Sequence, residues 1–371
     1  MTACYGCSKG RRADEQPVSY RKGITLKGLA FQRRKLLSLS VAALAIGASA
    51  GFTASASADT TSLIGAGSTL VAPLEAEWAS AFASKTGISV NYNAVGSGTG
   101  IADISQGTVD FGASDAPLST TQAAGCHNCI QIPWALSATG VGYNVAGVGH
   151  KLRLTGPVLA NIYLGNITNW SAPQIKSLNP GVHLPNLKIT PVFRSDGSGD
   201  TYAFTDYLSH VSSGWASKVG PAATSVSFPA GVSGKGNSGV TADLEATNGS
   251  IAYIAVSYLI AHHLPAVAIK NAAGKYEYPN LSNIENAAAV VKHVPANNAM
   301  HIVNPPKNAK IAYPISTFTY VIAPTTAPNG AALKQFIRYA LGAGQSFGQN
   351  LDFAPLPKVV KNAAKASVNR L

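Results

Sequence analysis

The sequence predicts an α/β fold made of two domains. Three observations favour it. Strand-like and helix-like stretches alternate along the chain, short loops rich in glycine, serine, threonine and aspartate follow several of the strands, and 371 residues suffice for two domains of ordinary size. A hydrophobic content of 46% with only 12% charged residues is typical of a compact globular chain and excludes a disordered one.

The elements of the first half follow from their residue patterns. An apolar–polar alternation predicts a strand at Ile88–Tyr92, and an apolar stripe predicts a helix over Ala72–Ser84. Short strands at Ser62–Ile64 and Val109–Gly112 and a short helix at Ile101–Gln106 are also expected. Ligands of open α/β sheets bind beyond the carboxyl ends of the strands, so we expect the polar loops to gather there.

The second half continues the alternation. A strand at Ala138–Val145 leads into it, and Thr201–Leu208 is a helix-like run. A strongly β-prone stretch, Pro314–Ile322, precedes a helix near Ala331–Leu341. The stretch Lys292–Lys310 contains paired asparagines and paired prolines, which predict an irregular loop.

Residues 1–58 have the pattern of a cleavable signal peptide with a long n-region. Arg33–Lys35 precede an apolar stretch, Leu36–Gly47, that is too short to span a membrane comfortably. Ala56–Ala58 fits the small-x-small cleavage pattern, so we expect cleavage near Ala58 and an exported mature chain that begins at Asp59. An uncleaved anchor is the alternative to cleavage, and the arginine pair leaves a twin-arginine export route open.

The positive charge is concentrated in this leader. Of a net charge of +12, residues 1–58 hold nine Lys and Arg against two Asp and Glu. The rest of the chain is therefore mildly basic, which suffices to attract an anion. It is too weak to predict nucleic-acid binding, and no basic-aromatic pattern supports that function.

Four cysteines form two Cys-x-x-Cys pairs. Cys4 and Cys7 lie in the leader, and since no cysteine stands at the cleavage site, no lipid anchor is expected. Cys126 and Cys129 stay in the mature chain, where an oxidising compartment favours a disulfide. Free thiols and a metal or redox role are the alternatives. Only His127 is near, and a zinc site needs more ligands, so we expect no metal.

Four loops carry groups suited to a buried oxyanion. The most informative places Arg194, aspartates, a serine and glycines directly ahead of a predicted helix. A helix N-terminus offers unpaired backbone N–H groups, and arginine adds a bidentate fork that matches tetrahedral oxyanions. The four loops are Gly65–Leu70, Gly96–Gly100, Ser114–Pro117 and Phe193–Asp200.

In this order and spacing, the loops resemble those of the phosphate-binding proteins that serve Pst-type ABC importers. The resemblance runs from about Leu63 to about Pro357, and it includes the stretches Val109–Leu118, Ile162–Trp170 and Gly234–Asn237. It implies a two-lobed periplasmic-binding-protein fold of the class II type, in which a two-segment hinge joins two α/β domains and the ligand lies in the cleft between them. Lobe 1 would comprise residues 59–140 plus 315–371, and lobe 2 residues 141–314.

The same resemblance implies the ligand residues. Arg194 would bind phosphate while Asp196 orients it. Asp115 would accept a hydrogen bond from phosphate, which still carries a proton, whereas sulfate has none to give. Each motif also has an ordinary alternative. Ser68 or Thr69 could cap a helix, and Gly96–Gly100 could be a flexible turn. Asp115 could be a turn or cap residue before Pro117, and Arg194 with Asp196 a surface salt bridge. The implied phosphate site consists of Thr69, Leu70, Ser97, Asp115, Arg194, Asp196, Ser198, Gly199, Asp200 and Thr201.

Asp200 departs from the family pattern, which usually has threonine at this position. Three outcomes are open: Asp200 caps the helix and points away from the ligand, Thr201 supplies the missing hydroxyl, or the site prefers the phosphate monoanion. We expect the first two together.

The function that follows is a non-enzymatic receptor without a cofactor. It would capture inorganic phosphate between its lobes and deliver it to the permease subunits of an ABC importer, as a monomer in the periplasm, cell envelope or extracellular space. One alternative binds sulfate or molybdate. Another is a secreted phosphatase-like enzyme with Ser97 or Ser198 as nucleophile, for which no general base is evident.

A further motif is discounted. Gly234–Gly239 matches the dinucleotide fingerprint G-x-G-x-x-G but lacks a convincing first-βα context and a suitably placed acidic residue. Lys235 and Asn237 are expected to shape the lobe surface or the rim of the cleft instead.

Overall fold

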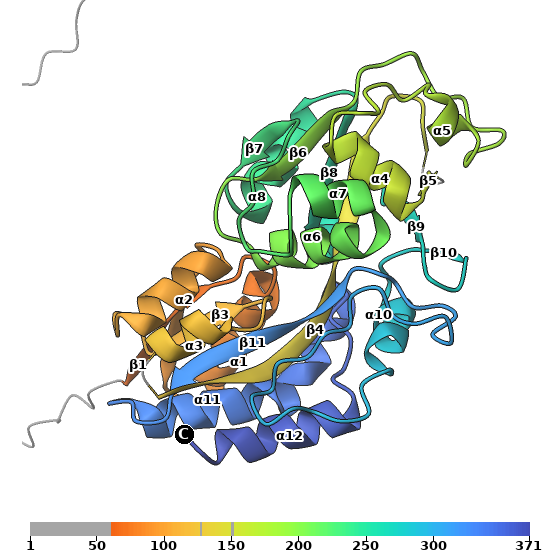
Figure 1. The fold of residues 1–371 in the computed structure, drawn as a ribbon. Helices are drawn as coiled ribbons and strands as arrows, with labels where there is room; N and C mark the ends of the chain where they lie inside the picture. The colour runs from red at the N-terminus through yellow and green to blue at the C-terminus, as the bar shows by residue number, and fades with distance from the viewer. Residues whose placement is uncertain (1–60, 127, 150–151) are drawn as a thin grey trace, which may run out of the picture. The chain divides into compact units, whose positions relative to one another are not determined.

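An eight-stranded mixed sheet runs through the part of the chain that this computed structural model describes, residues 61–126, 128–149 and 152–371. Its strand order is β2-β1-β3-β11-β4-β8-β6-β7 (Figure 1). In chain order the strands are β1 (Ser62–Gly67), β2 (Ser89–Asn93), β3 (Phe111–Ser114), β4 (Cys129–Asn144), β6 (Thr190–Arg194), β7 (Val232–Gly234), β8 (Ser250–Ala255) and β11 (Ser316–Pro324). A smaller sheet, ordered β10-β9-β5, contains β5 (Arg153–Leu154), β9 (Ala268–Lys270) and β10 (Tyr276–Glu277).

Helices flank these strands, so the predicted α/β class is confirmed (Figure 1). Two of the predicted helices begin earlier than expected, because the glycine-rich loops before them already form their first turns. The helices are α1 (Ala72–Thr86), α2 (Ser97–Ser105), α3 (Thr120–Gly125), α4 (Gly156–Tyr163), α5 (Pro173–Lys176), α6 (Gly199–Val211), α7 (Ser213–Lys218), α8 (Gly236–Ala246), α9 (Val256–Ala261), α10 (Leu281–Ala288), α11 (Gly330–Ala340) and α12 (Lys358–Val368), with a 3-10 helix, η1 (Ala343–Leu351).

Strand β4 connects the two halves of the large sheet. Residues Cys129–Ala138 pair with β11, and Thr139–Asn144 pair with β8. The sequence predicted only the second half of this strand, because the first half contains Pro133 and is buried without alternation. The point at which β4 changes its pairing partner lies beside residue 140, where the first predicted lobe segment ends. The division into lobes at residues 59–140 plus 315–371 and 141–314 stays a prediction.

Aromatic side chains pack into two clusters along the sheet. Trp78, Phe111, Trp134 and Phe336 surround one another, with the rings of Trp78 and Trp134 5.1 Å apart. Further along, Phe204 on α6 stacks on Tyr253 of β8, with ring centroids 4.4 Å apart. Each cluster buries large apolar surfaces, which is the main stabilising contribution to a core. The loops that follow β1, β3 and β6 are therefore mounted on rigid supports.

The predicted irregular loop is tied to the neighbouring strands. Residues 292–310 contain no helix or strand. Asn298 Nδ2 donates to the Gln131 carbonyl on β4 at 2.7 Å and to Ser367 Oγ on α12 at 2.9 Å. The Met300 N–H donates to the Tyr320 hydroxyl on β11 at 3.1 Å. The loop is thus anchored to β4, β11 and α12.

Two further expectations concern export. Cys126 and Cys129 are joined by a disulfide, as predicted. Within residues 61–126, 128–149 and 152–371, no helix is long and apolar enough to cross a membrane. The expected signal peptide and its cysteines, Cys4 and Cys7, lie outside the described residues.

Candidate functional site

The four predicted anion loops meet in one buried cluster. Three of them follow the ends of β1, β3 and β6, and the fourth forms the first turn of α2. The Gly199 N–H donates to Ser97 Oγ at 3.0 Å, and the Gly98 N–H donates to the Gly197 carbonyl at 2.9 Å. A Cβ added to Gly199 would collide with the Asp115 side chain, so glycine is required there. The predicted residues that are almost fully buried are Thr69, Leu70, Ser97, Asp115, Arg194, Ser198, Gly199, Asp200 and Thr201.

Arg194 lies between two carboxylates. Its Nε donates to Asp196 Oδ1 at 2.8 Å, a second N–H pairs with Asp196 Oδ2, and Nη1 donates to Asp200 Oδ2 at 3.2 Å. Burial alone would lower the pKa of Arg194, but the two carboxylates outweigh it and raise that pKa above its ordinary value. The guanidinium has more N–H donors than these three bonds use. It is a fixed cation that can still donate to an oxyanion.

Asp196 is the ionised partner of this arginine. Its Oδ1 also accepts the Gly236 N–H at 2.8 Å. Partial burial acts to raise the pKa of Asp196, but the bonds and charge of Arg194 prevail and lower it. The arrangement fits the implied role of Asp196, which is to orient Arg194.

Asp115 is held by hydroxyl groups. Ser68 Oγ lies 2.7 Å from Asp115 Oδ1 and 2.6 Å from Oδ2, and Thr319 Oγ1 donates to Oδ1 at 2.8 Å. A serine has one hydroxyl hydrogen, so Ser68 serves only one of the two oxygens at a time. Burial, and then the charge of Asp200, raise the pKa of Asp115 to about 7 although both hydroxyls and Arg194 act to lower it. The carboxyl group therefore keeps capacity for another hydrogen bond.

Asp200 faces the same cluster. Its Oδ1 accepts from Thr139 Oγ1 at 2.7 Å, and its Oδ2 accepts from Asn237 Nδ2 at 2.8 Å as well as from Arg194. Burial raises the pKa of Asp200 despite the neighbouring guanidinium. The expectation that Asp200 caps α6 is wrong. Ser198 is the N-cap residue, and its Oγ accepts the Thr201 N–H at 3.3 Å.

Two predicted donors have protein partners in this structure. The Thr201 hydroxyl bonds to the Tyr253 hydroxyl at 2.7 Å, and that tyrosine oxygen also accepts the backbone N–H of Arg194. The Leu70 N–H donates to Ser68 Oγ at 3.0 Å. Both groups therefore help to order the cluster.

Sequence reasoning missed four members of the cluster. Asn237 was expected at the lobe surface or cleft rim, but it is fully buried, and its Nδ2 donates to Thr69 Oγ1 at 2.8 Å and to Asp200. The resemblance of Gly234–Asn237 to the family was the available signal. Ser68 had only been weighed as a cap residue. Thr139 and Thr319 reach in from β4 and β11, where threonine is too common to attract notice.

Negative charge is in excess at this site. The cluster contains three carboxyl groups and one guanidinium, that of Arg194. Asp196 and Asp200 pair with the guanidinium, and Asp115 is bonded to hydroxyl groups nearby. The raised pKa values of Asp115 and Asp200 have the same physical origin, burial with too little compensating positive charge.

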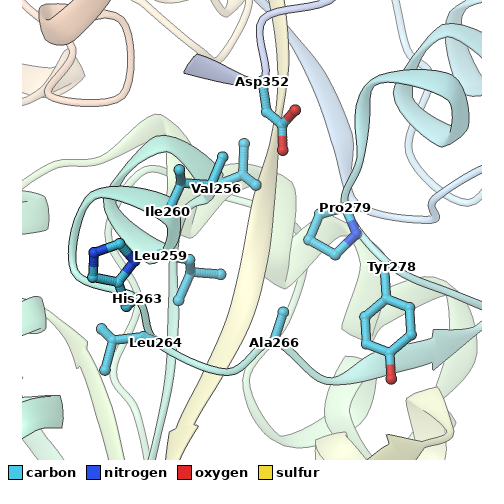
Figure 2. Close-up of a pocket in the computed structure, with 9 residues that line it drawn as sticks. All are labelled: Val256, Leu259, Ile260, His263, Leu264, Ala266, Tyr278, Pro279 and Asp352. Atoms are coloured by element: carbon cyan, nitrogen blue, oxygen red, sulfur yellow. The ribbon is translucent and has the colours of Figure 1, made fainter. Parts of the chain in front are cut away.

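A separate pocket of about 430 Å³ lies beside α9 and has a mainly apolar wall (Figure 2). It shares no residue with the polar cluster, and its wall contains no arginine or lysine to balance the charge of an oxyanion. The candidate site is therefore the polar cluster. The pocket is lined by Val256, Leu259, Ile260, His263, Leu264, Ala266, Tyr278, Pro279 and Asp352.

Comparison with known folds agrees with this architecture. A periplasmic phosphate-binding protein of high affinity, solved with bound phosphate, superposes with a TM-score of 0.66 at 22% identity, covering 83% of this chain and 94% of that one. A putative phosphate ABC transporter substrate-binding protein from Clostridium perfringens, also with bound phosphate, gives a TM-score of 0.59 at 20% identity over 80% of this chain and 100% of that one. At these identities the likeness concerns the fold.

Sequence comparison defines the family. The model of the PBP superfamily domain matches residues 53–343. Phosphate-binding protein PstS of Xylella fastidiosa strain Temecula1 is 38% identical over 299 residues, which are 79% of this chain and 81% of that protein. Phosphate-binding protein PstS of Haemophilus influenzae is 34% identical over 314 residues, 83% of this chain and 93% of that protein. These matches cover most of the chain. The chain therefore belongs to the PBP superfamily and, within it, to the PstS family of phosphate-binding proteins.

Proposed function

We propose that this protein captures inorganic phosphate in the cluster around Arg194 and delivers it to the permease of an ABC importer. The names of its relatives support the ligand class. The observation that carries the proposal is that Arg194 and Asp115 lie in one buried cluster. The guanidinium attracts an oxyanion, and the carboxyl group interacts with whatever proton that oxyanion carries.

Asp115 would provide the discrimination against sulfate. Phosphate at neutral pH has a P–O–H group that can donate to the free lone pairs of Asp115. Above about pH 7, where Asp115 is ionised, sulfate has no proton to share, so its oxygen would face a carboxylate oxygen with no hydrogen between them. A buried, repelling pair of acceptors is costly, and specificity of this kind works by penalising the wrong ligand.

We further propose that the site favours the phosphate monoanion. The cluster holds three carboxyl groups and a single guanidinium, and two of these carboxyl groups, those of Asp115 and Asp200, have raised pKa values. Adding a dianion would increase the repulsion, whereas a monoanion brings a second proton to share with Asp115. This is the third of the three outcomes considered for Asp200. It replaces the expectation that Asp200 points away from the ligand, because Asp200 is bonded to Arg194, Thr139 and Asn237 within the cluster.

The bound form would be the closed one. Ser97 and Thr69 belong to the predicted first lobe, while Gly199 and Asn237 belong to the predicted second. Hydrogen bonds of 3.0 Å and 2.8 Å already join these pairs. A phosphate ion that contacts both lobes would add further bonds that form only in the closed arrangement. Binding would therefore shift the hinge equilibrium towards the closed form.

The proposed role is capture without catalysis. Ser97 Oγ accepts the N–H groups of Asp115 and Gly199 and lies 3.4 Å from Asp115 Oδ2, and Ser198 Oγ caps α6, so both hydroxyls help to order the cluster. We propose that the mature chain is exported after cleavage near Ala58 and acts as a monomer in the periplasm or cell envelope.

Calorimetric titration of the phosphate-stripped protein tests the proposal. Phosphate should bind one-to-one, and sulfate at the same concentrations should give no binding heat. If sulfate binds as well as phosphate, the role given to Asp115 is wrong. If neither anion binds, the protein is not a phosphate receptor.

A further inference from the structure

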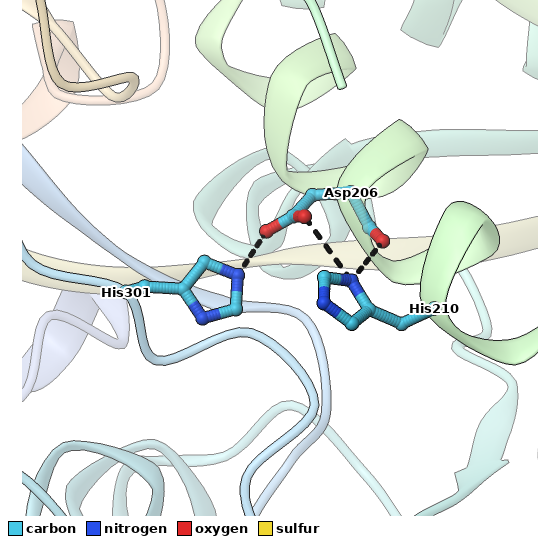
Figure 3. A group of neighbouring side chains, drawn as sticks. All are labelled: Asp206, His210 and His301. Carbon is cyan, nitrogen blue, oxygen red and sulfur yellow. Dashed lines mark hydrogen bonds and ion pairs between the residues drawn. The ribbon is translucent and has the colours of Figure 1, made fainter. Parts of the chain in front are cut away.

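A second group of ionisable side chains lies away from the anion cluster. Asp206 and His210 are one turn apart on α6, and His301 reaches them from the anchored loop (Figure 3). His301 Nε2 is bonded to Asp206 Oδ2. His210 Nδ1 lies 2.8 Å from the backbone carbonyl oxygen of Asp206 and 3.2 Å from Asp206 Oδ1. One ligand atom of each residue lies within 4.8 Å of the others.

The three side chains have the composition of a metal site. Imidazole nitrogen and carboxylate oxygen are ligands that Zn²⁺ and neighbouring divalent ions accept. Ligand atoms around a tetrahedral ion with bonds of about 2 Å lie roughly 3.4 Å apart, so small side-chain rotations would complete the set. The Asp206 side chain is only 9% exposed, whereas those of His210 and His301 are 49% and 48% exposed. The carboxylate is thus largely shielded from water, and the solvent side is open for a fourth ligand.

We propose that Asp206, His210 and His301 bind a divalent transition-metal ion, with zinc as the best match. Three protein ligands and one water molecule would surround the ion. The binding role is assigned to residues that the phosphate site does not use.

The position of this site gives it a mechanical consequence. The first turn of α6 carries Ser198 as its cap and Asp200 of the anion cluster, and the following turns carry Asp206 and His210. His301 belongs to the loop that Asn298 and Met300 tie to β4 and β11. Since β11 also supplies Thr319 to Asp115, a metal ion would fasten together the two supports of the anion cluster.

This connection predicts coupling, a step that rests on the proposed phosphate function. If zinc and phosphate both favour the arrangement in which α6 and β11 are close, each ligand should strengthen the binding of the other by the same factor. The metal site itself does not depend on phosphate.

Zinc titration in competition with a chromophoric chelator tests the site. The full chain should carry Cys4→Ser and Cys7→Ser throughout, because a Cys-x-x-Cys pair also binds zinc. Work at pH 8 is appropriate, since the bond to Asp206 raises the pKa of His301 and zinc must displace that proton. We expect one equivalent of zinc, with an affinity that falls at least tenfold in both His210→Ala and His301→Ala.

His262→Ala is the matched control. His262 bonds to Glu245 at 2.9 Å and is also about half exposed, but among the residues that the structure describes no third metal-ligating side chain joins this pair. Zinc affinity should not change in this variant. The proposal is overturned if the parent binds no zinc, or if His210→Ala and His301→Ala bind it as the parent does. His301→Gln, which keeps the size and polarity of the side chain, replaces His301→Ala if the alanine variant does not fold.

Cobalt and phosphate supply independent readouts. Co²⁺ in the parent should give the visible absorption of a four-coordinate ion, and His301→Gln should lose it. Phosphate titrations with and without zinc then separate the claims. Zinc binding without an effect on phosphate affinity would refute the coupling and leave the site, whereas zinc binding without any phosphate binding would refute the proposed function alone.

Discussion

At the scale of single residues, the site depends on how charge is balanced in a buried place. Arg194 is fixed from two sides by Asp196 and Asp200, and Asp115 is fixed by Ser68 and Thr319. Such preorganised groups need little rearrangement when a ligand arrives, which favours affinity. Each substitution below changes one charge or one donor in this arrangement.

Replacing Arg194 should abolish most of the phosphate affinity. In Arg194→Ala the anion would face Asp115, Asp196 and Asp200 without a cation, and truncating one member of a buried charge pair costs about 2–5 kcal/mol or more. We expect a loss of at least about 100-fold by calorimetry. Arg153→Ala is the control, since Arg153 lies over the Tyr276 ring outside the cluster. Retained affinity in Arg194→Ala would show that phosphate binds elsewhere.

Replacing Asp115 by asparagine should relax the discrimination between anions. The amide can donate a hydrogen bond to an unprotonated oxygen, which the carboxylate cannot. We expect measurable sulfate binding in Asp115→Asn and weaker phosphate binding, both by calorimetric titration. A variant that loses phosphate binding but still ignores sulfate would contradict the proton-sensing role.

Phosphate affinity should fall as the pH rises above neutrality. Burial and the charge of Asp200 raise the pKa of Asp115 to about 7, so this carboxyl group loses its proton in the same range in which phosphate loses its second one. If phosphate is bound as the monoanion, binding at alkaline pH takes up one proton from solution. The phosphate affinity then drops by about tenfold per pH unit. Titrations between pH 6 and pH 9 check this, and a flat profile would rule out a preference for the monoanion.

Sequence reasoning found charged residues better than it found their supports. Arg194, Asp196 and Asp115 stand in unusual glycine-rich contexts, so their loops could be recognised. Thr139 and Thr319 stand in ordinary strands, and only the pairing of β4 with β11 and β8 brings them to the site. Such residues cannot be identified until the register of the sheet is known.

At the scale of elements, helix α6 contributes residues both to the anion cluster and to the proposed metal site. Its N-terminus lies in the anion cluster, and its last two turns carry Asp206 and His210. Ser198 sets the start of the helix, with extended backbone angles (φ −128°, ψ 136°) and its hydroxyl on the Thr201 N–H. The helix start predicted at Thr201 was late because Gly199 and Asp200, both poor helix formers, are already helical.

Removing the N-cap of α6 should change both the stability of the fold and the phosphate affinity, whereas removing another helix cap should change the stability alone. Ser198→Ala should lower the free energy of unfolding by about 1 kcal/mol, as loss of an N-cap usually does, and should also weaken phosphate binding because the turn beside Arg194 loosens. Ser212→Ala removes the equivalent cap of α7, whose Oγ accepts the Trp215 N–H. It should cost similar stability with unchanged phosphate affinity. Urea unfolding and calorimetry check both variants, and equal phosphate affinities would contradict the role of the α6 cap.

At the scale of the whole molecule, a single sheet supports both sides of the site. Strand β4 pairs first with β11 and then with β8, and the aromatic clusters of Trp134 and Tyr253 pack on either part. Alternation of strands and helices predicted the α/β class. It could not predict the strand order, because β11 joins the sheet from nearly 180 residues beyond β4 and nothing local encodes that pairing.

Phosphate should stabilise the folded protein as a whole. A ligand that binds only the folded state adds about 2.7 kcal/mol at a concentration 100 times its dissociation constant. Thermal unfolding should therefore shift upward with phosphate and not with sulfate at equal ionic strength. Equal shifts with the two salts would mean a general salt effect and no specific site.

Insertion of β11 between β3 and β4 also sets an order of assembly during synthesis. The sheet at the N-terminal side, with its tryptophan core, lacks its central strand until Ser316–Pro324 has left the ribosome. More than four-fifths of the chain is made before that moment. The nascent chain therefore has a long interval in which its first half cannot close, and this interval is available to any chaperone or translocation machinery that must engage it before folding.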